Sequence, residues 1–201
     1  MDTQHRYLTA VDCLSSTSNS GNSWWHGLSL GTLVHDQLRS LIIETGGLSR
    51  DVIGQIVSAR LPELEHLEIW TGNPEYGADS SVEDVRPFFE SSRFPKLKYL
   101  GIKNCDFGDE LAALAVSLPI LLQVEILDFS MGAMSDAGAE ILLKNSSHFA
   151  SLKKLDLGEN MLTAKTTNLF AEFPCEVSTD GQREGWVDQQ GNVHRYPAVG
   201  E

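Results

Sequence analysis

The stretch FPKLKYLGIKNCDFGDELA, residues 94–112, contains the pattern that decides the fold. Its apolar residues Leu97, Leu100 and Ile102 follow the order apolar-x-x-apolar-x-apolar, and Cys105 comes three positions later. Successive side chains of a strand point to opposite faces, so Leu100 and Ile102 lie on the same face. The pattern predicts a short strand that sends its apolar side chains into a core, followed by a turn at Cys105.

The same pattern occurs five times along the chain, which indicates an internal repeat. The copies begin at Leu38, Leu64, Leu97, Val124 and Leu152, and their turn positions hold Gly46, Gly72, Cys105, Gly132 and Asn160. Successive copies begin 26, 33, 27 and 28 residues apart. The longest copy contains an insertion at 72–80, whose Gly, Asn, Pro and Asp residues predict a surface loop.

Between the predicted strands the apolar residues change to a helical period. Val82, Val85 and Phe89 recur at i, i+3 and i+7, and Ser81 stands where an N-cap belongs. A strand and a helix in every copy are typical of a leucine-rich repeat of the ribonuclease-inhibitor-like kind. The predicted fold is therefore α/β: a right-handed β-α superhelix, or solenoid, with parallel strands on the concave face and helices on the convex face.

The N-terminal part of the chain departs from this repeat. Residues 1–24 are mostly polar, and 15–23 consist of Ser, Thr, Asn and Gly, so we expect this segment to be disordered. Trp25, Leu28 and Leu30 fit the phase of the repeat and predict a short copy that has a strand but no helix.

The C-terminal part is predicted to close the repeat domain, which spans 25–177. A last strand is expected to end this domain at 175–177. In the remaining segment, 178–201, short apolar stretches flank the loop sequence QQGN at 189–192, which is typical of a hairpin. We expect this C-terminal hairpin to cap the open end of the solenoid.

From Leu28 to the C-terminus, the chain resembles a family of bacterial leucine-rich-repeat proteins with no assigned biochemical function. The resemblance rests on LRSLIIETGGL (38–48), LPELEHLEIW (61–70), FPKLKYLGIKNCDFGDELA (94–112), VEILDFSMGAMSDAGAEILL (124–143), LKKLDLGEN (152–160) and RYPAVGE (195–201). Members carry a further N-terminal segment with an acidic helix and an additional repeat, so this chain is similar to an N-terminally shortened member. The resemblance implies no catalytic or ligand-binding residues.

Composition excludes several classes of function. The 201 residues include 28 acidic and 15 basic side chains, and a net charge of −13 argues against nucleic-acid binding. No apolar run is long enough to span a bilayer, and the first twenty residues lack the order of a secretory signal. Cys13, Cys105 and Cys175 are an odd, widely spaced set that is typical of reduced thiols, so we expect a cytoplasmic protein.

The residues between the core positions of each strand are the candidates for function. Neighbouring parallel strands lie about 4.8 Å apart, so equivalent residues of successive strands stand side by side. On the concave face this produces a patch of aromatic, aliphatic and charged residues: Ile42, His66, Glu68, Trp70, Tyr99, Lys103, Ile126 and Asp128. Exposed aromatics ringed by charge are typical of partner-binding hot spots, so the predicted function is non-enzymatic binding of a protein partner. In the alternative reading, Trp70 only supports the insertion at 72–80.

Catalysis, metals and cofactors are not expected. Asp128 and Asp156 are neighbours in the pattern, but Lys154 on the same face predicts a solvated charged surface rather than an acid–base pair. The six histidines have no metal-ligand spacing, and neither a Gly-x-Ser-x-Gly elbow nor a phosphate-binding glycine loop is present.

Two further surfaces enter the predictions. Without a cap, the first strand near Leu28 would expose its edge, so the alternative function is a structural or regulatory subunit that docks or forms a homodimer through this N-terminal edge. A set of acidic residues falls on the predicted convex side: Glu63, Glu65, Glu83, Asp84 and Glu90. We expect these residues to keep the protein in solution, with a basic partner as the alternative.

Overall fold

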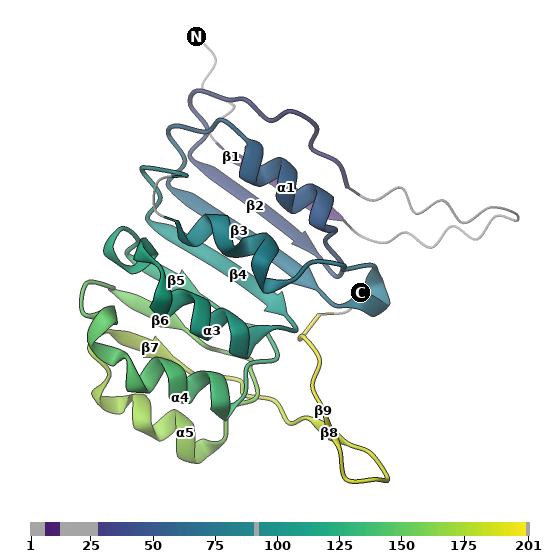
Figure 1. The fold of residues 1–201 in the computed structure, drawn as a ribbon, viewed down its shortest axis with the longest axis vertical. Helices are drawn as coiled ribbons and strands as arrows, with labels where there is room; N and C mark the ends of the chain where they lie inside the picture. The colour runs from purple at the N-terminus through teal and green to yellow at the C-terminus, as the bar shows by residue number, and fades with distance from the viewer. Residues whose placement is uncertain (1–6, 13–27, 91–92, 200–201) are drawn as a thin grey trace, which may run out of the picture.

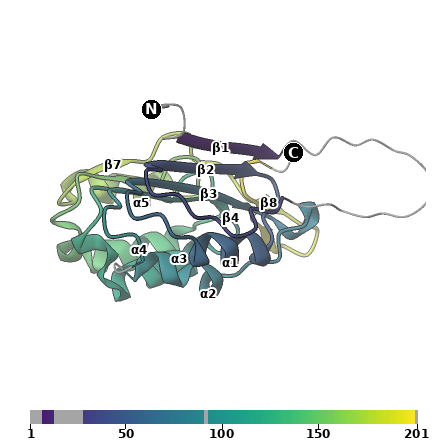
Figure 2. The ribbon, with the colours of Figure 1, turned by 90° about the horizontal axis from the view of Figure 1, so that it is seen from above.

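The computed structural model describes residues 7–12, 28–90 and 93–199. It has an α/β architecture in which a seven-stranded parallel sheet carries the α-helices along one face (Figure 1, Figure 2). The strands are β1 Tyr7–Asp12, β2 Ser40–Thr45, β3 His66–Gly72, β4 Tyr99–Cys105, β5 Ile126–Asp128, β6 Lys154–Asp156 and β7 Glu176–Ser178. The helices are α1 Arg50–Ser58, α2 Val82–Val85, α3 Gly108–Ser117, α4 Asp136–Lys144 and α5 Ala164–Leu169.

The strands pair in the order in which they occur along the chain, from β1 to β7, and every pair in this sheet is parallel. The middle leucine of each predicted copy occupies one row of the register: Leu41, Leu67, Leu100, Leu127 and Leu155. All five side chains are completely buried. The predicted parallel arrangement and its central core row are therefore confirmed.

Short 3₁₀ segments complete the connections. They are η1 Pro74–Tyr76, η2 Arg86–Phe89, η3 Pro119–Leu122, η4 Ser146–Phe149 and η5 Phe170–Glu172. The first lies in the predicted insertion, and each of the others follows a helix and leads towards the next strand. Their aromatic side chains Phe88, Phe89 and Phe149 are almost completely buried between the helices and the sheet.

The turn positions connect neighbouring copies through buried hydrogen bonds. The Asn160 side chain donates to the carbonyls of Phe129 (2.8 Å) and Leu157 (3.1 Å) and accepts from the backbone N–H of Met134 (3.0 Å). Cys105 is buried, and this burial raises the pKa of its thiol. The Asn160 side chain thus supplies partners for buried backbone groups that water cannot reach. Cys105 belongs to the core through its burial.

Aspartates connect the helices in the same way. Asp109, in the first turn of α3, accepts hydrogen bonds from the backbone N–H of Ser135 (2.7 Å) and of Gly138 (3.1 Å) at the start of α4. Asp136, at the start of α4, accepts from the backbone N–H of Thr163 (2.8 Å), the N-cap of α5. Each carboxylate therefore satisfies free N–H groups at the N-terminus of the following helix.

The N-terminal prediction needs correction. Tyr7–Asp12 forms β1, parallel to β2, inside the segment 1–24 that was expected to be disordered. No strand forms at 28–30, so the sheet edge predicted near Leu28 belongs to β1. The remainder of 1–24, together with Trp25, lies outside the described residues.

A sequence signal for β1 was present. Leu8 and Ala10 align with Leu41 and Ile43, and Cys13 follows Ala10 at the same spacing as Gly46 follows Ile43. The first apolar position of this copy holds His5, and alanine replaces a larger residue, so the pattern was too weak to count as a copy.

The C-terminal hairpin forms as a separate two-stranded sheet and does not extend the main sheet at β7. The strands β8 (Trp186–Val187) and β9 (Val193–His194) pair antiparallel and project away from β7 (Figure 1). The chain then returns across the ends of β5 and β4. The backbone N–H of Ala198 donates to the Met131 carbonyl (2.7 Å), and the Asn104 side chain both donates to the carbonyl of Val199 (2.7 Å) and accepts from its N–H (2.9 Å). These bonds hold residues 198 and 199 against the ends of β5 and β4.

None of the described helices combines the length and the apolar character needed to cross a membrane.

Candidate functional site

Within the described residues, the face of the sheet opposite the helices is open (Figure 2), and we call it the open face. The register places the predicted site residues on it in three rows. Tyr99 lies between His66 and Ile126 in the first row. Glu68 lies between Ile42 and Gly101 with Asp128 next in the second row, and Trp70 pairs with Lys103 in the third. Side-chain contacts connect six of these residues, the open-face cluster: His66, Glu68, Trp70, Tyr99, Lys103 and Asp128.

Glu68 lies at the centre of the open-face cluster. It accepts a hydrogen bond from the Trp70 indole N–H (2.7 Å), the Tyr99 hydroxyl oxygen lies 3.3 Å away, and Lys103 Nζ lies 3.2 Å from its Oε1. Burial by itself would raise the pKa of this carboxyl. The neighbouring His66 imidazole, the Trp70 N–H and the Lys103 charge outweigh burial and lower the Glu68 pKa to about 2. Glu68 is therefore ionised at neutral pH.

Asp128 provides the second carboxylate of the open-face cluster. It accepts a 2.6 Å hydrogen bond from the Tyr99 hydroxyl and a 2.9 Å bond from the backbone N–H of Ser130, and Lys103 Nζ lies 3.7 Å away. Burial and the Asp128 charge raise the pKa of Tyr99 well above its ordinary value. The phenol has a single proton to donate, so its shorter contact, to Asp128, takes the hydrogen bond.

Aromatic contacts connect neighbouring members of the open-face cluster. The rings of His66 and Tyr99 stack with their centroids 3.9 Å apart and their planes 5° from parallel. Lys103 Nζ lies 5.2 Å from the centroid of the Trp70 ring, at cation–π distance. These contacts join β3 to β4 on the open face.

Gly101 makes room for this arrangement. A Cβ at this position would lie 3.0 Å from the Tyr99 ring, 3.1 Å from its hydroxyl and 3.4 Å from Glu68 Cγ. In the sequence, Gly101 is one of several glycines in or just after the strands, and nothing distinguishes it from the glycines of the turns. Its role appears only with the position of the Tyr99 ring.

Most polar groups of the open-face cluster bond to one another. Both carboxylates have hydrogen-bond donors and share one lysine, while His66 Nε2 is buried 3.6 Å from Glu68, beyond hydrogen-bonding distance. The low pKa of Glu68 makes its carboxylate a weak base at neutral pH. Two isoleucines flank the cluster, Ile42 and Ile126, and both are half-buried.

Asp156, the register neighbour of Asp128, has separate partners. Its carboxylate pairs with Lys154 (2.9 Å) and accepts from the backbone N–H of Gly158 (3.0 Å). Each aspartate thus has its own lysine and its own backbone donor, which does not favour a shared-proton pair. Among the described residues, no three His, Cys, Asp or Glu side chains come together as metal ligands.

The acidic residues expected on the convex side are largely paired. Glu63 bonds to Lys96 (2.7 Å), Glu65 to Lys98 (2.8 Å) and Glu83 to Arg86 (2.6 Å), while Asp84 accepts from the N–H of its N-cap, Ser81. One row immediately before the strands alternates in sign: Arg39, Glu65, Lys98, Glu125 and Lys153. The register thus places Glu65 and Glu125 beside basic residues of the neighbouring strands.

No protein-family model matches the chain. Among solved structures, it is similar to a protein from Bacteroides fragilis whose crystal structure was determined as a structural genomics target, with 31% sequence identity and a TM-score of 0.74. The match covers 78% of this chain but 45% of that protein, so this chain spans less than half of its neighbour's length. The likeness supports the α/β arrangement of parallel strands and helices.

Proposed function

We propose that the chain is a leucine-rich-repeat solenoid that binds a protein partner on its open face, without catalysis or a cofactor. The proposal also places it in the cytoplasm, which is consistent with Cys105 and Cys175 being free thiols.

The observation that carries this proposal is the way two aromatic side chains are held. Trp70 and Tyr99 lie on neighbouring strands and donate to Glu68 and Asp128, so their rotamers are restricted before any partner arrives. Ordering a side chain at an interface costs about 0.5–1.5 kcal/mol, and a cluster that is already ordered avoids this cost. Rigid aromatic residues at the centre of a surface are typical of binding hot spots.

Ile126 offers the sharpest test because it lies next to the open-face cluster and has an aliphatic side chain. An Ile126→Arg substitution adds charge to the open face and leaves the hydrogen bonds of Glu68 and Asp128 in place. Leu169→Arg is the matched control, since Leu169 in α5 is 56% exposed and belongs to the helical layer.

Affinity capture from a bacterial lysate, quantified by mass spectrometry, compares the three proteins. A partner of the open face is retained by the wild type and by Leu169→Arg, and is lost with Ile126→Arg. If all three retain the same set of proteins, the open face does not select a partner.

The second candidate function is docking or homodimerisation through the edge of the sheet. β1 is six residues long, and within the described part of the chain no strand pairs with its outer edge. Light scattering tests this candidate. A concentration-dependent dimer that becomes a monomer with Thr9→Pro, which removes a backbone donor from β1, supports it, and a monomer at every concentration contradicts it.

A further inference from the structure

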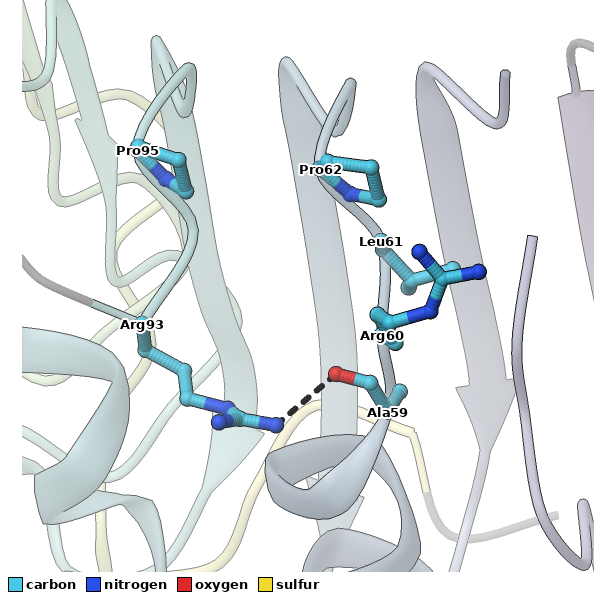
Figure 3. A pocket seen from close by; sticks show the side chains of 6 residues that line it. All are labelled: Ala59, Arg60, Leu61, Pro62, Arg93 and Pro95. Atoms are coloured by element: carbon cyan, nitrogen blue, oxygen red, sulfur yellow. Dashed lines mark hydrogen bonds between the residues drawn. The ribbon is translucent and has the colours of Figure 1, made fainter. Parts of the chain in front are cut away.

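A pocket of about 340 Å³ lies at the opposite end of the strands from the C-terminal tail, where the chain passes from a helix into the next strand. Figure 3 shows its two walls, one from the segment before β3 and one from the segment before β4. The lining residues are Ala59, Arg60, Leu61, Pro62, Arg93 and Pro95. Its walls are thus largely apolar, with two guanidinium groups.

Arg93 crosses from one wall towards the other. Its Nη2 donates a 2.8 Å hydrogen bond to the carbonyl of Ala59 (Figure 3), and its guanidinium carbon lies 5.8 Å from the centroid of the Phe94 ring. These two contacts orient the guanidinium group but use only one of its five N–H donors. Arg60 points away from Arg93 in Figure 3 and bonds to Asp36 at 2.7 Å.

Arg93 differs from the other arginines that the structure describes. Five of the other six lie within 4 Å of a carboxylate: Arg39, Arg50, Arg60, Arg86 and Arg195. The sixth, Arg183, donates hydrogen bonds to three backbone carbonyls. For Arg93, no carboxylate of residues 28–90 or 93–199 lies within that distance. This lack is unusual in a chain with a net charge of −13.

The repeat explains which group Arg93 lacks. Arg60-Leu61-Pro62 and Arg93-Phe94-Pro95 are equivalent, since Arg60 lies four residues before Leu64 and Arg93 four residues before Leu97. Arg60 takes its carboxylate from Asp36, two residues before the start of the preceding copy. The residue in that place for Arg93 is Pro62, which has no charge and lines the pocket instead.

We propose that this pocket binds the carboxylate of an acidic peptide segment, which occupies for Arg93 the place that Asp36 occupies for Arg60. A guanidinium group pairs with a carboxylate through two parallel hydrogen bonds. Pro62 and Pro95 offer apolar contacts to the residues on either side of the acid. This site lies away from the open face, so the proposal is independent of the function proposed above.

Fluorescence anisotropy of a labelled, capped five-residue peptide with glutamate between leucines measures this binding. The same peptide with glutamine instead of glutamate is the probe for charge. We expect saturable binding of the glutamate peptide that weakens with salt, and about tenfold weaker binding or none for the glutamine peptide. Equal binding of the two peptides overturns the proposal.

Two substitutions locate the site. Arg93→Gln removes the charge, and Pro62→Asp provides the carboxylate from within the chain, so each should weaken binding of the glutamate peptide about tenfold or more. Arg86→Gln is the matched control, because this arginine pairs with Glu83 outside the pocket and should bind the peptide as the wild type does. Circular dichroism checks that all three variants are folded.

Unchanged affinity in both Arg93→Gln and Pro62→Asp would place the binding elsewhere and refute the assignment. Inorganic phosphate tests the kind of anion. If it displaces the peptide at lower concentration than capped glutamate does, the pocket is a general oxyanion site and the peptide assignment is wrong. If capped glutamate is the better competitor, the carboxylate assignment stands.

Discussion

The hydroxyl of Tyr99 donates a 2.6 Å hydrogen bond to Asp128, from one strand of the open face to the next. Both groups are largely removed from water, and Asp128 is only 6% exposed. A buried carboxylate without a donor is costly, so this bond connects the shape of the open face to the stability of the protein.

Tyr99→Phe removes this bond and leaves the ring in place. We expect the free energy of unfolding to fall by about 1–3 kcal/mol, because Asp128 loses its shortest donor. Urea unfolding at neutral pH measures the change. Tyr196→Phe is the control: this ring is 44% exposed, so its substitution should change stability by no more than about 0.5 kcal/mol. Equal effects of the two substitutions would show that the bond to Asp128 contributes no stability.

Glu68 should make the protein less stable in acid. Its pKa in the folded state is about 2, below its ordinary 4.5, so its ionised form is stabilised by folding. This contribution is complete above about pH 5 and disappears as the pH falls towards 2. We expect the wild type to lose about 2 kcal/mol more than Glu68→Gln between pH 6 and pH 3, measured by urea unfolding. Parallel pH profiles of the two proteins would contradict this assignment.

Leu127→Ala should weaken the whole sheet. Its side chain is completely buried in the central row, so we expect a loss of about 2–5 kcal/mol in a single unfolding transition, because neighbouring copies share one core. Calorimetry shows both the loss and the number of transitions. Leu122→Ala, at a side chain that is 80% exposed, should have little effect. Two separate transitions in Leu127→Ala would mean that the copies unfold independently.

Asn104→Gly should release the C-terminal tail. The backbone of Asn104 has a φ of 52°, which glycine adopts easily, so the substitution mainly removes the two hydrogen bonds to Val199. We expect faster hydrogen exchange in residues 195–199. Glu159→Gly is a close control, with a φ of 55° and an exposed side chain, and it should leave exchange in the tail unchanged. If Asn104→Gly also leaves it unchanged, the side chain of Asn104 does not hold the tail.

Much of the sheet follows from local rules. The spacing of Leu38, Leu64 and Leu97 predicts parallel strands, and alternation along each strand predicts which side chains enter the core. The same two rules place Trp70 next to Lys103 and Tyr99 next to His66. β1 escaped prediction because Ala10 made its copy too weak to recognise. The C-terminal tail escaped because its partners are far away in the sequence, such as Asn104 for Val199.

By itself, the sequence determined the repeat, the order of the strands and the rows of residues on each face, because periodic spacing is a local property of the chain. Only the tertiary structure decided how those residues are used. The Tyr99 ring reaches Asp128 because Gly101 leaves space beneath it, and Arg93 lacks the carboxylate that Arg60 has because Pro62 is its neighbour. The contact between Tyr99 and Asp128 depends on side-chain orientations between strands, which no spacing along the chain specifies.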